Sequence, residues 1–86
     1  MDASLIKDPA LLKKYLKDNG IIGVYVDKDN YSGSYKVFEA VGNGAGYPTG
    51  DFFKVKKAAH LKALKWANHT GLPVIKSNPA KKVGKV

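Results

Sequence analysis

The chain has 86 residues, which is enough for one small domain and too few for two, and its lack of cysteine excludes disulfides, thiolate nucleophiles and the usual cysteine-based zinc and iron–sulfur sites. All 15 basic residues are lysine, and against seven acids they give a net charge of +8, which favours a polyanionic partner. No stretch is apolar enough for a membrane span or a signal peptide, so we expect a soluble cytoplasmic protein without a membrane partner.

The first predicted element is a helix over residues 8–20. Asp8 is a good N-cap, Pro9 suits the first helical position, and Gly20 is expected to end the helix. An apolar stripe at helical spacing predicts that this helix packs on the core through Leu11, Leu12, Tyr15 and Leu16.

Three strands are predicted next. Residues 21–26 and 34–41 are rich in β-branched and aromatic side chains, and the polar segment between them predicts an antiparallel hairpin. The glycine-rich segment 42–50, which contains Tyr47, is predicted to be a loop. Residues 52–55 are then predicted to form a short third strand.

The second predicted helix covers residues 56–68, which are rich in alanine, leucine and lysine, and Gly71 ends it. Alanines recur every fourth residue and predict a small-residue face packed against the sheet, whereas Lys62 and Lys65 are expected to point to solvent. Residues 72–75 are compatible with a short edge strand.

The fold expected from this order is an α+β domain over residues 1–76. An antiparallel sheet of three or four strands packs against two helices, in the order α-β-β-β-α with a short final strand as the variant. Residues 77–86 are polar and basic, which is typical of a flexible tail.

The positive charge is confined to the second part of the chain. Residues 1–53 hold six lysines and all seven acids, whereas residues 54–86 hold nine lysines and no acid. Such a block attracts phosphate backbones or acidic protein surfaces, and its plainer interpretation is a solvated surface. Lysine without arginine suits sequence-tolerant phosphate contacts better than bidentate reading of guanine.

The lysines at the start of the second predicted helix are the most informative cluster, because this helix end already carries about half a positive charge from aligned peptide dipoles. A bound phosphate would relieve the repulsion and accept from the helix amides. Lysines further along the helix extend the patch, tail lysines add diffuse attraction, and an aromatic side chain in the glycine-rich loop is a candidate for base stacking. The candidate nucleic-acid-binding residues are Lys54, Lys56, Lys57, Lys62, Lys65, Lys81, Lys82 and Tyr47.

The segment Lys56-Lys57-Ala58-Ala59, followed by Ala63-Leu64 and Ala67, resembles the final helix of double-stranded RNA-binding domains, and the order of the predicted elements resembles that family as well. The resemblance implies that Lys56 and Lys57 contact phosphates across a groove of the duplex. The chain has no counterpart of the glutamate on the family's first helix or of its Gly-Pro loop between the first two strands. The order of three strands and a helix also resembles arm-type DNA-binding domains of integrases.

The function expected from these features is nucleic-acid binding with low sequence specificity, with duplex favoured over single strand. The alternative is a small protein-binding inhibitor or regulator of viral or mobile-element origin, which docks its basic helix on an acidic surface of a larger protein. Catalysis is not expected, because the acids show no spacing of a recognised active site. No cofactor or metal is expected either, because His60 and His69 are nine positions apart and have no third partner.

Overall fold

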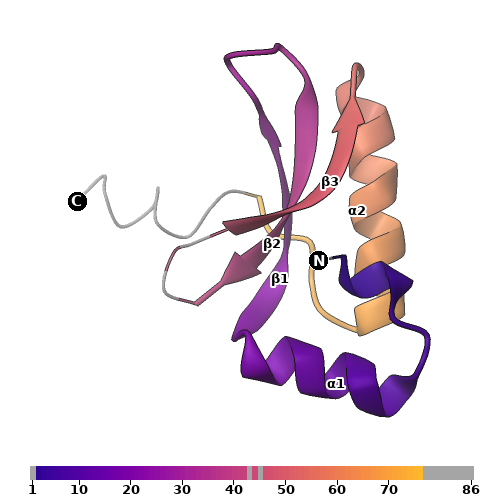
Figure 1. The fold of residues 1–86 in the computed structure, drawn as a ribbon. Helices are drawn as coiled ribbons and strands as arrows, with labels where there is room; N and C mark the ends of the chain where they lie inside the picture. The colour runs from indigo at the N-terminus through magenta and orange to yellow at the C-terminus, as the bar shows by residue number, and fades with distance from the viewer. Residues whose placement is uncertain (1, 43, 45, 77–86) are drawn as a thin grey trace.

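A computed structural model describes residues 2–42, 44 and 46–76 (Figure 1). The elements in chain order are a short 3₁₀ helix η1 (Ala3–Leu5), helix α1 (Pro9–Asp18), strands β1 (Ile21–Lys28), β2 (Tyr35–Val41) and β3 (Gly46–Phe53), and helix α2 (Lys56–Thr70). The three strands form an antiparallel sheet in the order β1-β2-β3. The predicted α+β class and the predicted order of helices and strands are therefore confirmed.

Helix α1 begins as predicted. The Asp8 side chain accepts from the Ala10 N–H, and Pro9 occupies the first turn, where no intrahelical partner is needed for its missing N–H. The chain leaves the helix at Asn19, and Gly20 follows with φ of +63°. The predicted apolar stripe is wrong at Leu11, which is exposed; the core is contacted by the remaining three of its residues, Leu12, Tyr15 and Leu16.

Strand β3 begins earlier than the predicted third strand. The segment 42–50 is not one long loop, because Gly46 already pairs with Ala40 and Tyr47 with Glu39. Glycine at position 46 permits this pairing, since a Cβ atom there would overlap the hydroxyl of the buried Tyr25. β3 is an edge strand, and Pro48 is tolerated in it for that reason.

The predicted final strand is reduced to a single parallel bridge between Val24 and Val74. The Val24 N–H donates to the Pro73 carbonyl at 3.0 Å, and the Val24 carbonyl accepts from the Ile75 N–H at 2.7 Å. The segment after α2 therefore lies beside β1 without forming a further strand of the sheet. The predicted tail, residues 77–86, lies outside the described residues.

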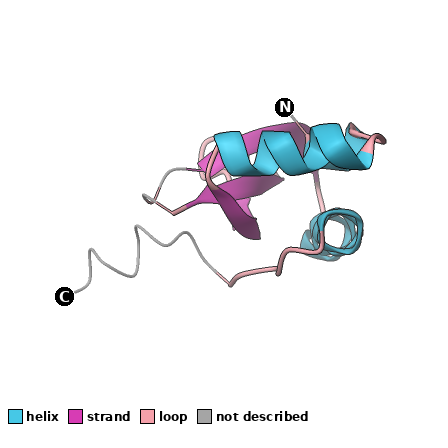
Figure 2. Cartoon of the chain, turned by 90° about the horizontal axis from the view of Figure 1, so that it is seen from below, coloured by secondary structure: helices cyan, strands magenta, loops and turns pink. Residues whose placement is uncertain are grey.

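Helix α2 runs alongside the strands, and α1 lies across one end of the sheet (Figure 1); seen from below, α2 is viewed end-on beside α1 (Figure 2). Ala59 and Ala63 of α2 are fully buried against Val24 and Val37, together with Trp66. Because alanine has only a methyl group, α2 can approach the sheet closely, as the alanine spacing predicts. The helix ends at Gly71, whose φ of +79° is a left-handed C-cap.

A buried carboxylate connects the layers. Glu39 on β2 is fully buried, and its Oε2 accepts from the Trp66 Nε1–H at 2.8 Å and from the Ala3 N–H at 2.7 Å. Its Oε1 accepts from the Tyr15 hydroxyl at 2.6 Å. Both oxygens of the carboxylate thus accept from donors on η1, α1 or α2, which positions these elements relative to the sheet.

Candidate nucleic-acid interface

The junction between β3 and α2 carries three exposed lysines, Lys54, Lys56 and Lys57, which we call the lysine cluster. The N-cap residue, Val55, has an extended backbone and makes no side-chain capping bond, and the first turn of α2 contains no acidic residue. The positive end of the helix therefore carries three lysines at or next to its first turn and no acidic residue within that turn. This arrangement can accept an anion through side chains and backbone amides together.

Lys62 does not belong to this cluster. Its Nζ lies 2.6 Å from Asp2 Oδ2 and 3.4 Å from Asp51 Oδ2, and it also donates to Ser4 Oγ at 3.0 Å. Only 20% of its side chain is exposed. The prediction that Lys62 points to solvent is wrong because the helix turns this position toward η1, where Asp2 is buried.

The titration of this pair follows from its contacts. Burial alone would raise the pKa of Asp2, but hydrogen bonds from Lys62 and Ser4 hold it below its usual value. Burial would likewise lower the pKa of Lys62, yet the bond to Asp2 and the nearby Asp51 carboxylate raise it. Lys62 therefore stays charged and anchors η1 to α2, which is a structural role.

Lys65 and Tyr47 lie apart from the lysine cluster. Lys65 is exposed but is nine positions beyond Lys56, which at about 100° per residue places it on the opposite side of α2. Tyr47, 42% exposed, is at the other end of β3, about 20 Å along the strand from Phe53. It borders a hollow beside α1 rather than the start of α2. Lys81 and Lys82 lie outside the described residues.

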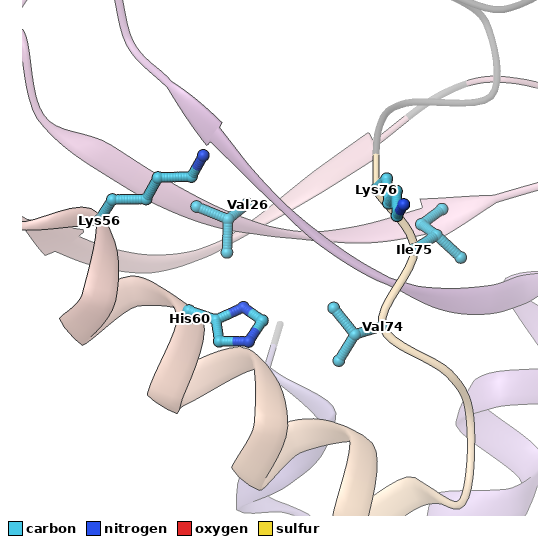
Figure 3. Close-up of a pocket in the computed structure, with 6 residues that line it drawn as sticks. All are labelled: Val26, Lys56, His60, Val74, Ile75 and Lys76. Carbon is cyan, nitrogen blue, oxygen red and sulfur yellow. The ribbon is translucent and has the colours of Figure 1, made fainter.

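A groove joins the lysine cluster to Lys76, which is not among the candidate residues that the sequence indicates. The groove has a volume of about 510 Å³ and lies between α2 and the segment that follows it (Figure 3). We call it the α2 groove; it is lined by Val26, Lys56, His60, Val74, Ile75 and Lys76.

The α2 groove combines an apolar floor with cationic sides. Val26 and Val74 face one another across its centre beside the His60 ring, while Lys56 and Lys76 lie on opposite sides (Figure 3). Among the described residues that line it, none is acidic. Lys56 and Lys76 are twenty positions apart, and only the pairing of residues 73–75 with β1 brings them to one groove, so no local sequence signal could have identified this site.

The two histidines do not converge. His60 faces the α2 groove, whereas His69 Nε2 lies 2.6 Å from the Ile6 carbonyl oxygen. Over residues 2–42, 44 and 46–76, no three metal-binding side chains come together. Within the same ranges, no helix has the length and hydropathy needed to cross a membrane.

No protein-family model matches the chain, and neither a curated protein nor a solved structure matches it. The resemblance to double-stranded RNA-binding domains therefore depends on the residues quoted above and on the order of elements.

Proposed function

We propose that this protein binds nucleic acid with low sequence specificity, through phosphate contacts at the lysine cluster. The observation that carries the proposal is the position of Lys54, Lys56 and Lys57 around the uncapped N-terminal end of α2. Two of the three, Lys56 and Lys57, are also the residues to which the resemblance to double-stranded RNA-binding domains assigns phosphate contacts.

The electrostatics of the free protein support a bound anion. Each lysine near the positive end of a helix costs about 0.3 to 1 kcal/mol at low salt. Phosphate oxygens would accept from the ammonium groups and from first-turn amides at once, which converts this repulsion into attraction. Lysine acts as a mobile point charge, so such contacts hold the backbone of the polymer without reading its bases.

A second candidate function is supported by the outer face of α2. Leu61 and Leu64 are 52% and 44% exposed there, on the same helix as the exposed Lys57 and Lys65. A mixed apolar and basic helix face fits an acidic protein surface with an apolar centre. In this case the chain would be a small protein-binding regulator or inhibitor.

A fluorescence-anisotropy titration separates the two candidates. Duplex DNA, duplex RNA and single strands are titrated at about 50 and 150 mM salt, because the logarithm of the binding constant for phosphate contacts falls linearly with the logarithm of the salt concentration. The proposal predicts binding that survives the higher salt concentration and a steep salt dependence. Lys56→Ala with Lys57→Ala should reduce the slope by about two. If no polymer binds at the higher salt, the nucleic-acid proposal is wrong and the protein-binding candidate takes its place.

A further inference from the structure

The α2 groove offers more than phosphate contacts. Its volume of about 510 Å³ is within the usual range of small-ligand sites. Its floor is aliphatic, and the imidazole of His60 lies beside that floor (Figure 3). Histidine rings and aliphatic side chains are suitable partners for the face of an unstacked base.

The edge of β1 adds a hydrogen-bonding pair at the groove. Both backbone groups of Val24 point to the segment beyond α2, where they bond with Pro73 and Ile75. In an antiparallel strand, residues two positions apart direct their N–H and carbonyl to the same edge, so those of Val26 point this way too. Among the described residues, no backbone bond joins Val26 to the segment beside it.

The open part of this edge is short. Val24 is already paired with the segment beyond α2, and on the other side of Val26 the Lys28 N–H donates to Asp27 Oδ1 at 2.9 Å. A peptide that adds as a strand needs a run of free backbone groups. The edge of one base needs only a donor and an acceptor, which Val26 alone supplies. The edge therefore favours a nucleotide over an extended peptide.

We propose that the α2 groove binds one unpaired nucleotide of a nucleic-acid strand. The base lies on Val26 and Val74 beside His60, and the phosphates on either side of this nucleotide contact Lys56 and Lys76. The positive charge on both sides of the groove complements the two phosphates, and the apolar floor complements the base. This inference rests on the proposed function and adds to it a base-dependent subsite, which selects unpaired over fully paired strands.

The test compares two single strands with equal numbers of phosphates. One is oligoadenylate of about ten nucleotides, and the other is an abasic strand of the same length. At about 150 mM salt, oligoadenylate should bind at least about fivefold more tightly, because stacking adds to the phosphate contacts. The methyl resonances of Val26 and Val74 should shift with oligoadenylate and not with the abasic strand.

The matched variants are His60→Ala and Leu61→Ala, two exposed neighbours on α2 of which only His60 lines the groove. His60→Ala should remove most of the preference for oligoadenylate and leave abasic binding unchanged, whereas Leu61→Ala should retain the preference. Equal affinity of the wild type for both strands would overturn the nucleotide subsite while leaving phosphate binding intact. Absence of binding to either strand would overturn the proposed function and the subsite together. Methyl shifts produced by an acidic peptide and not by oligoadenylate would overturn the choice of a nucleotide.

Discussion

The indole N–H of Trp66 donates to the carboxylate of Glu39 at 2.8 Å, and both side chains are fully buried. This bond joins α2, which carries Lys56 and Lys57 of the lysine cluster, to the central strand of the sheet. Because the same oxygen also accepts from the Ala3 N–H, the carboxylate connects three separate parts of the chain. The orientation of the proposed interface therefore depends on one buried acid.

Replacement of Glu39 should separate the effect of hydrogen bonding from that of charge. Glu39→Leu leaves the Trp66 and Ala3 N–H groups buried without an acceptor, and we expect a loss of about 2 to 5 kcal/mol in unfolding free energy. Glu39→Gln should cost less, because its amide oxygen can accept both bonds while the Tyr15 hydroxyl turns to accept from the amide nitrogen. Urea unfolding followed by circular dichroism measures both, and equal losses would contradict this assignment.

The Tyr15 hydroxyl should make stability sensitive to alkaline pH. Burial and the hydrogen bond to the Glu39 carboxylate raise the pKa of Tyr15 above its ordinary value. Because this pKa is raised in the folded state, the protonated hydroxyl stabilises the fold fully at pH values below the pKa of tyrosine in the unfolded chain, about 10. This contribution is lost as pH rises from there through the folded-state pKa. Tyr15→Phe should therefore be less stable than the wild type at pH 7, and the difference should narrow above pH 10. A constant difference across this range would show that the hydroxyl is not held as described.

Lys62, which has a structural role, and Lys57, which is proposed to bind phosphate, should differ in how their replacement affects stability and the salt dependence of binding. Lys62→Met leaves the buried Asp2 carboxylate without its cation, and we expect a loss of about 1.5 to 3 kcal/mol in unfolding free energy, with an unchanged salt slope for oligonucleotide binding. Since the pKa of Asp2 is lowered in the fold, this loss should disappear as pH falls below about 4. Lys57→Met should have the opposite profile, with intact stability and a slope reduced by about one. A reduced slope for Lys62→Met would contradict its structural role.

The fold should require glycine at position 46, because there is no room for a side chain there. A Cβ atom at this position would overlap the hydroxyl of Tyr25, which is buried and stacked on Phe38 with ring centroids 5.1 Å apart, so the ring has little room to move. We expect Gly46→Ala to destabilise the protein by about 1 to 3 kcal/mol. Gly42→Ala is the control, because its Cβ would meet only an Ile22 methyl at 4.0 Å. Thermal unfolding of both variants tests this prediction. Similar unfolding midpoints for the two variants would contradict a close contact between position 46 and Tyr25.

The fold was predictable from the sequence wherever local signals determine the structure. Asp8 and Pro9 mark the start of α1, and the alanine spacing together with Gly71 defines the buried face and end of α2. The prediction was wrong at the start of β3, because a glycine-rich composition normally favours a loop. A strand can contain such a glycine when a neighbouring side chain leaves no room for a Cβ atom. At Gly46 that reason is the ring of Tyr25, twenty-one positions earlier in the chain.

The candidate site was only partly predictable for the same reason. Clustering at the start of a helix is a local property, so Lys56 and Lys57 could be identified directly. Lys62 carries the same charge on the same helix, but its role depends on Asp2, sixty positions away. The groove between Lys56 and Lys76 depends on a backbone pairing that no local pattern reveals.

The measurement that tests the central claim most directly compares the salt dependence of oligonucleotide binding in two triple variants of equal net charge. One carries alanine at Lys54, Lys56 and Lys57, and the other carries alanine at the exposed lysines Lys7, Lys13 and Lys17. Both remove three positive charges, so a merely diffuse attraction would weaken equally. We predict that the first variant reduces the slope of log K against log salt by about three, whereas the second keeps the wild-type slope. Equal slopes in the two variants would contradict a phosphate site at the start of α2.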